Sequence, residues 1–189
     1  MKALTLTQPW ATLIAIGAKR IETRSWGTDF HGQIAIHAVK GLSPVGGKRG
    51  LADQCTMAAF ADALRRGGYA LGAETYLNDK PLPLGAIVAV AVLDRVRRID
   101  MKLRAEVMAQ TITPNEIDFG DYTSGRYAWF LESVLPLAEP IPCNGALSLW
   151  DVPEDVNRQI LMQLEGLGEE DLNESARATR EQQIALNLR

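Results

Sequence analysis

The chain has 189 residues, of which 47% are hydrophobic and 23% charged, and its net charge at pH 7 is −3. This composition is ordinary for one globular domain. It excludes a membrane-spanning helix, because no apolar run approaches the roughly 20 residues that a span needs. It also excludes a disulfide framework or a cysteine metal cluster, because the two cysteines, Cys55 and Cys143, lie far apart in the sequence. The N-terminus has no signal-peptide pattern, so we expect a cytoplasmic protein.

The negative charge is concentrated near the C-terminus. Residues 154–189 hold eight of the 23 acidic side chains but four of the 20 basic ones. Residues 1–153 therefore carry 16 basic and 15 acidic side chains, a net charge of +1. A nearly neutral body attracts nucleic acid weakly at long range, so phosphate binding must come from a local patch and be modest in affinity. We predict a main domain at 1–153 and an acidic, helical C-terminal extension at 154–189.

Hydrophobic periodicity predicts short strands and helices that alternate along the chain. In chain order these are a strand at 3–7, a helix at 8–16, strands at 20–25 and 32–38, a helix at 51–66, a strand at 84–95, a helix at 100–109, strands at 127–137 and 146–151, and a helix at 154–164. Thr113, Pro114 and Glu116 have the pattern of a short turn with its own cap. Strands with short helices inserted at one end predict an α+β fold built on a small, mixed β-barrel.

The most informative stretch follows the first predicted helix, which Gly17 ends. In a strand at 20–25, Arg20, Glu22 and Arg24 share one face, and Lys19 lies in the turn before them. Cations placed so closely either bind an anion or pair with nearby carboxylates. Exposed cross-strand pairs of that second kind contribute only about 0.2–1 kcal/mol each.

This stretch resembles a known family. The spacing Gly17-x-Lys19-x-x-Glu22-x-Arg24 matches the G-x-K-x-x-E-x-R signature of the ASCH domain family, a branch of the PUA-like β-barrels. The resemblance covers roughly residues 2–152, and it extends to Gln8-Pro9-Trp10-Ala11, Ser25-Trp26, Gly32-x-Ile34-x-Ile36, Leu84-Gly85-Ala86-Ile87-Val88 and Gly145-Ala146-Leu147-Ser148-Leu149-Trp150. The same residues look like the ASCH domain of the activating signal cointegrator, a transcriptional coactivator. The resemblance implies a PUA-like barrel that binds RNA or a modified nucleotide.

Seven residues around the motif are candidates for binding a nucleic acid. They are Gln8, Trp10, Lys19, Arg20, Glu22, Arg24 and Trp26. We expect Lys19 and Arg24 to hold phosphate in a solvent-open cleft. Trp26 is expected to stack on a base for about 1–3 kcal/mol, and Gln8 to read a base edge or a ribose hydroxyl. The expected partner is RNA or a nucleotide, with single-stranded DNA as an alternative, and neither a cofactor, a metal nor a membrane is expected.

Structural roles are the alternative for several of these residues. Trp10 can be a core residue packed under the barrel. Lys19 and Glu22 can form a salt bridge that holds the turn. His37 and His31 lie too far from other ligand types to suggest a metal site, and we expect His37 to be half-buried with its polar atoms satisfied.

A second basic string follows the apolar strand at 84–95. It contains Arg95, Arg97 and Arg98, and Lys102 and Arg104 come shortly after. These side chains either extend a phosphate track or form a solvated surface.

An enzymatic role is a further alternative that the resemblance implies. Some small ASCH-family proteins are amidohydrolases that remove acyl groups from N4-acetylcytidine, with a threonine nucleophile where this chain has Glu22. Thr23 is one residue away and is expected to face away from Lys19, so this chain departs from that pattern. If the chain is an enzyme, Lys19 and Glu22 are the catalytic candidates, with Glu22 as the base that activates water. Ribonuclease activity has also been proposed within the family.

Overall fold

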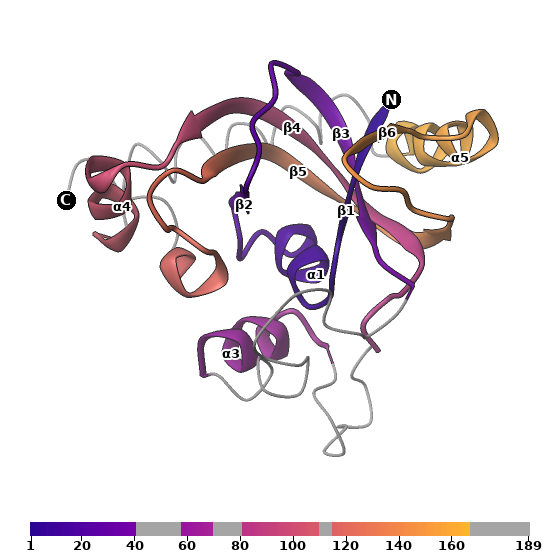
Figure 1. The fold of residues 1–189 in the computed structure, drawn as a ribbon. Coiled ribbons are helices and arrows are strands. Elements are labelled where there is room, and N and C mark those ends of the chain that lie inside the picture. Colours follow the sequence, from indigo (N-terminus) through magenta and orange to yellow (C-terminus); the bar gives the residue numbers. More distant parts are fainter. Residues whose placement is uncertain (41–57, 70–80, 110–114, 167–189) are drawn as a thin grey trace.

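The computed structural model describes residues 1–40, 58–69, 81–109 and 115–166. Six strands form one curled, mixed sheet in the order β2-β5-β4-β3-β1-β6 (Figure 1). Their bounds are β1 (Lys2–Leu6), β2 (Ile21–Arg24), β3 (Gly32–Ala38), β4 (Ala86–Arg98), β5 (Tyr127–Pro142) and β6 (Leu149–Asp151). β1 and β3 run parallel, and the other neighbouring strands are antiparallel. The predicted α+β fold with a small, mixed PUA-like barrel is confirmed.

The two long central strands curl the sheet. The register of β4 against β5 shifts at three places along its length, and β3 against β4 shifts once, between Ile36 and His37. Each such irregularity adds local twist and bends the strand that carries it. The sheet therefore wraps around the first helix, α1 (Trp10–Ala15), whose residues from Ala11 to Ala15 are all buried.

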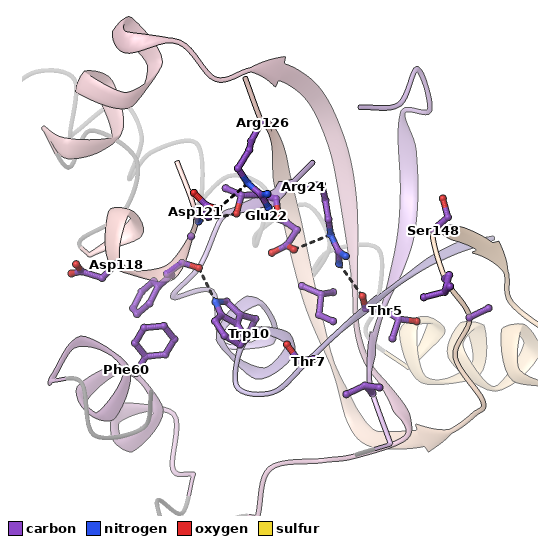
Figure 2. Close-up of a pocket in the computed structure, with 17 residues that line it drawn as sticks. Thr5, Thr7, Trp10, Glu22, Arg24, Phe60, Asp118, Asp121, Arg126 and Ser148 are labelled. Atoms are coloured by element: carbon purple, nitrogen blue, oxygen red, sulfur yellow. Dashed lines mark hydrogen bonds and ion pairs between the residues drawn. The ribbon is translucent and has the colours of Figure 1, made fainter. Parts of the chain in front are cut away.

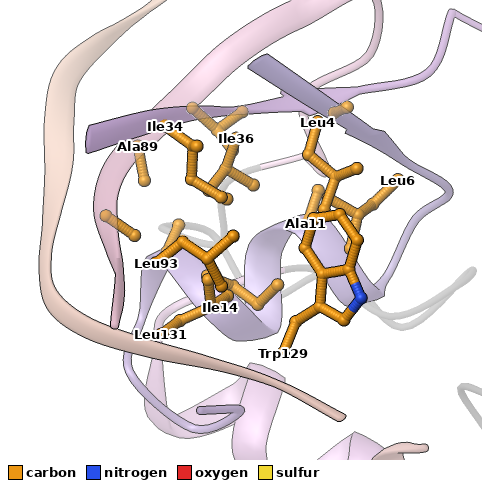
Figure 3. Packing of buried hydrophobic residues seen from close by; sticks show 14 residues of the cluster. Leu4, Leu6, Ala11, Ile14, Ile34, Ile36, Ala89, Leu93, Trp129 and Leu131 are labelled. Atoms are coloured by element: carbon orange, nitrogen blue, oxygen red, sulfur yellow. The ribbon is translucent and has the colours of Figure 1, made fainter. Parts of the chain in front are cut away.

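The main core fills the space between α1 and the curled sheet. Figure 3 shows Ala11 and Ile14 of the helix facing Ile36 and Leu93 of the strands, with the Trp129 indole along one side. Trp129 is the largest fully buried side chain, and its indole N–H donates to the carbonyl oxygen of Trp26. Removing a buried side chain of this size typically costs about 3–5 kcal/mol.

Short helices pack around α1 and the sheet. α3 (Ala58–Arg66) packs through Phe60 and Leu64, α4 (Met101–Met108) follows β4, and a 3-10 turn, η1 (Glu116–Phe119), precedes β5. α5 (Glu154–Glu165) places Val156, Ile160 and Leu164 on the outer face of the barrel against Leu137 and Ile141 of β5. No helix among the described residues is long and apolar enough to cross a membrane.

Most predicted elements are confirmed, and three boundaries were wrong. β4 continues to Arg98, three residues past its predicted end. β5 continues to Pro142, five residues past the predicted end, because β4 pairs with it as far as Ala86. β6 begins at Leu149 instead of 146, because Ser148 has a φ of 61° and interrupts the extended chain. The first part of the predicted helix at 51–66, the residues Thr113 and Pro114, and the tail at 167–189 lie outside the described residues. The division at residue 153 stays a prediction.

Candidate functional site

Lys19 of the motif is enclosed by protein. Gly17, with a φ of 73°, ends α1, and the Lys19 backbone N–H donates to Leu13 at 3.0 Å, which turns the side chain inward. Its ammonium donates to the carbonyl oxygen of Ile21 and lies 3.7 Å from both Glu22 Oε2 and Glu116 Oε1. The side chain has no exposed surface. The expectation that this ammonium faces a solvent-open cleft was wrong, because two internal carboxylates surround it.

Glu116 is the residue that sequence reasoning missed beside Lys19. Its carboxylate is fully buried, and it accepts hydrogen bonds from the backbone N–H groups of Arg20 at 2.7 Å and Ile21 at 3.1 Å. It also accepts from the Tyr122 hydroxyl at 3.2 Å. Burial, and then the Glu116 charge, raise the pKa of Tyr122 well above its usual value. Glu116 thus forms a brace between η1 and β2, and its expected capping role with Thr113 stays a prediction.

The brace has a physical reason in the sheet topology. β2 is an edge strand, so its outward-facing backbone groups have no neighbouring strand to bond. Ile21 directs its N–H to Glu116 and its carbonyl to Lys19. A buried carboxylate and a buried ammonium thus replace the missing strand, as buried backbone groups require partners.

A cavity of about 860 Å³ adjoins this brace (Figure 2). Its walls come from the end of β1, Trp10 of α1, residues 22–24 of β2, residues 118–121 after η1, Arg126, and the loop at 146–148. This volume lies within the range of about 300–1,000 Å³ that is common for small-molecule sites. Lys19 does not line the cavity, but Glu22, its ion-pair partner, does.

Two arginines lie on the cavity wall, each held by a carboxylate and a carbonyl. Arg24 Nε is 3.0 Å from Glu22 Oε1, and Arg24 Nη2 donates to the Thr5 carbonyl at 2.8 Å. Arg126 Nε is 3.3 Å from Asp121 Oδ2, and its Nη2 donates to the Thr23 carbonyl at 3.3 Å. Both Nε atoms are buried against their carboxylates and are not aligned as hydrogen bonds, so the outer parts of the guanidinium groups are what the cavity can reach.

The cavity wall carries both signs of charge. Glu22, Asp118 and Asp121 oppose Arg24 and Arg126. The Thr123 hydroxyl, with a smaller contribution from Arg126, lowers the pKa of Asp121 below its usual value, so this carboxylate is ionised at neutral pH. Such a wall offers guanidinium donors to a phosphate and carboxylate acceptors to the amino groups of a base.

The seven candidate residues separate into two groups. Trp10, Glu22 and Arg24 line the cavity, whereas Gln8, Lys19, Arg20 and Trp26 do not. Gln8 is buried; its amide NH2 donates to the Pro83 carbonyl and its amide oxygen accepts from the Thr12 N–H, so both ends of the amide are bonded inside the protein.

The two motif tryptophans also differ in position. The Trp10 indole N–H donates to the Phe119 carbonyl at 2.8 Å while its ring forms part of the cavity wall. Trp26 packs edge-to-face on Trp129, with ring centroids 4.7 Å apart, away from the cavity. Trp10 is therefore the tryptophan that a ligand in the cavity would meet.

Two residues of the second basic string, Arg95 and Arg97, are paired with acidic groups. Arg95 lies 2.6 Å from Asp94 and over the Phe130 ring, and Arg97 lies 3.2 Å from Glu106. These contacts are typical of a solvated surface. Within the described parts of the chain, no group of three or more His, Cys, Asp or Glu residues could hold a metal ion.

Comparison with known proteins identifies the family. The sequence profile of the ASCH domain matches residues 4–141. The chain belongs to the ASCH domain family. The crystal structure of ASCH from Zymomonas mobilis is similar to it at 14% identity and a TM-score of 0.49, over 85% of this chain and 93% of that one. Two mutant structures of the same protein are similar at 14% and 13% identity, with TM-scores of 0.49 and 0.48; each covers 85% of this chain, and the alignments cover 96% and 94% of theirs. No curated protein matches the sequence.

Proposed function

We propose that this ASCH domain binds RNA, or a modified nucleotide, in the cavity beside β2. The observation that carries the proposal is the pair of partly exposed arginines on one wall of the cavity, with side chains that are 25% and 30% exposed. A guanidinium fork binds phosphate through two parallel hydrogen bonds, and it can do so while keeping one contact to its carboxylate. Arg24 and Arg126 take the phosphate-binding role that the sequence had assigned to Lys19 and Arg24.

The remaining walls suit the rest of a nucleotide. Trp10 supplies an aromatic surface, and Asp118 and Glu22 supply acceptors for the exocyclic amino group of a base. A base must leave its stack to enter such a cavity, so we propose a single-stranded or looped ligand. Lys19 and Glu116 do not contact the ligand in this proposal. They position β2, the strand that carries Glu22 and Arg24.

The charge balance sets the expected strength of binding. Two arginines cannot compensate many phosphates, and the three carboxylates on the wall repel those that approach. We therefore propose modest affinity that rests on one or two phosphate contacts.

Fluorescence anisotropy with a labelled single-stranded RNA of ten nucleotides tests this proposal. We expect log K to fall with log salt concentration with a slope of about −1.4, because each phosphate contact on a single strand contributes about −0.7. Duplex RNA of the same sequence should bind more weakly, since its bases are not free. Equal affinity for the duplex, or binding that ignores salt, would contradict a cavity that takes a single nucleotide and its phosphate. Single-stranded DNA of the same sequence measures the contribution of the 2′-hydroxyl.

A hydrolytic activity is the second candidate, and the position of Glu22 favours it. This carboxylate lies between the buried Lys19 ammonium and the open cavity, where it could take a proton from water. Thr23 also lines the cavity, but its hydroxyl already accepts from the Asp121 N–H at 3.0 Å. Turnover of N4-acetylcytidine, or cleavage of the labelled RNA, that disappears in Glu22→Gln would support this candidate. RNA binding without turnover of either substrate would reject the hydrolytic activity and support only the binding function.

A further inference from the structure

His37 on β3 lies directly beneath the loop that closes one side of the cavity. The loop at 143–148 joins β5 to β6, and its residues 146–148 form part of the cavity wall. The imidazole is 1% exposed, and its ring packs edge-to-face on Trp150 with centroids 5.6 Å apart. The Trp150 indole N–H in turn donates to the Thr5 hydroxyl at 3.0 Å.

One nitrogen of this imidazole has no partner. Nε2 lies 3.0 Å from the Cys143 carbonyl oxygen, an acceptor, so Nε2 carries the proton and Nδ1 is the free base. Nδ1 is buried and has no hydrogen-bond partner in the described chain. The expectation that His37 would have its polar atoms satisfied is therefore wrong for this nitrogen. Buried orphan groups of this kind require an explanation.

Gly145 of the loop covers the free nitrogen. A β-carbon on Gly145 would lie 2.5 Å from His37 Nδ1 and 2.7 Å from the Thr5 hydroxyl oxygen, closer than any real contact. The glycine backbone thus lies against the ring without space for a side chain between them.

Cys143 anchors the start of the loop, because its N–H donates to the Gly85 carbonyl at 2.9 Å and its carbonyl bonds His37, but the rest of the loop is lightly held. Residues 144–148 are all exposed, and Leu147 is 93% exposed at the rim of the cavity. Ser148 has a φ of 61°, a left-handed conformation that costs about 1–2 kcal/mol for a residue with a β-carbon. A small change at His37 can therefore displace this loop.

Among the described residues, no charged group contributes to the pKa of His37; Asp155 of α5 acts on Cys143, whose pKa it raises. On the flanking strands, Lys2 of β1 is paired with Asp151 of β6 at 2.8 Å, and Arg24 is bonded to the Thr5 carbonyl. β4 presents Ile87 opposite the ring, and the Cys143 thiol stays neutral because burial raises its pKa.

We propose that protonation of His37 at Nδ1 lifts the loop at 143–148 off the ring and opens the adjoining wall of the cavity in mildly acidic solution. Burial lowers the pKa of His37 below its usual 6.5, so the folded protein prefers the neutral ring. The unfolded chain takes up a proton first as the pH falls, so stability is full above about pH 6.5 and is lost as the pH falls toward the lowered value. Lifting the loop exposes Nδ1 to water, so the charged imidazole no longer has to be buried. The consequence that ligand affinity changes with pH rests on the proposed function; the loop movement does not.

NMR spectra of the free protein between pH 7.5 and 5.0 test the loop movement. Wild type and the control His31→Gln, which removes the other, exposed histidine, should show the Gly145 amide and the Trp150 indole signals shifting together in one titration. The protection factor of the Trp150 indole N–H should fall at least tenfold, while that of the buried Trp129 indole stays constant. His37→Gln keeps a donor for the Cys143 carbonyl but cannot titrate, so both signals should stay fixed.

Two outcomes would overturn the proposal. One is a Gly145 amide signal that shifts with pH in His37→Gln as it does in wild type. The other is protonation of His37 in wild type without any shift of the Gly145 and Trp150 signals. Gly145→Ala is a second variant, and it should show the open-loop signals already at pH 7.5, because its β-carbon meets the ring. Closed-loop signals in that variant would also contradict the mechanism. RNA affinity at pH 7.5 and 5.5 is measured separately, so that a moving loop with unchanged affinity rejects only the link to binding.

Discussion

Replacing Lys19 by methionine is expected to lower the free energy of unfolding by about 3–5 kcal/mol, the usual cost of removing one member of a buried ion pair. Methionine preserves most of the side-chain volume, so the loss reflects charge more than packing. Glu22 and Glu116 would remain in the interior without the ammonium between them, and the Ile21 carbonyl would lose its donor. Urea unfolding followed by circular dichroism measures the change.

Lys2→Met is the matched control for this prediction. Lys2 also pairs with a carboxylate, that of Asp151 at 2.8 Å, but both side chains are partly or largely exposed. Such a surface pair contributes about 0–1 kcal/mol, so this control should unfold nearly as wild type does. A stable Lys19→Met variant that has lost RNA binding would show that the ammonium contacts the ligand, and it would reject the buried brace.

The double variant Arg24→Gln, Arg126→Gln is expected to weaken binding of single-stranded RNA by about 100-fold or more. A hydrogen bond to a charged group contributes about 1.5–3 kcal/mol, and each 1.4 kcal/mol is a tenfold change in affinity. The salt slope of binding should also approach zero in the double variant, because the phosphate contacts are gone. Anisotropy with the ten-nucleotide RNA measures both quantities.

Arg95→Gln is the control for charge alone. Arg95 is exposed, is paired with Asp94 and lies over Phe130, outside the cavity lining. Its loss changes the net charge by the same amount per substitution and should alter affinity by less than about threefold at physiological salt. A large loss in this control with a small one in the double variant would place the RNA on the β4 surface.

The helices and strands of this fold can be predicted from the sequence pattern, but the burial of individual side chains cannot. Gly17 and Pro9 delimit α1, and alternation assigns Glu22 and Arg24 to one face of β2, where their side chains form an ion pair at 3.0 Å. Thr23, of the opposite parity, also lines the cavity. Alternation predicts the side of the strand on which a side chain lies, but not how deeply that side chain is buried. Lys19 is buried because Glu116, almost a hundred residues later, reaches the same strand edge.

Arg126 illustrates the same limit for the candidate site. It precedes β5 in the chain, and the pairing of Tyr127 with Arg24 brings it beside the motif. No local pattern distinguishes Arg126 from the other arginines, since its position depends on the register between two distant strands. The sequence favoured Trp26 as the residue that stacks on a base and allowed Trp10 a core role, whereas Trp10 lines the cavity and Trp26 does not. The packing of Trp26 on Trp129 depends on the curled sheet, which no local pattern shows.

An NMR titration with the ten-nucleotide RNA tests the central claim most directly, because four tryptophans report on separate places. Trp10 lines the cavity, Trp26 and Trp129 pack behind it, and Trp150 supports the loop at 143–148. The account predicts that the Trp10 indole signal and the side-chain Nε–H signals of Arg24 and Arg126 shift with the added RNA, while the Trp26 indole signal stays in place. Shifts confined to Trp26, or to arginines of β4, with Trp10 unchanged, would contradict it.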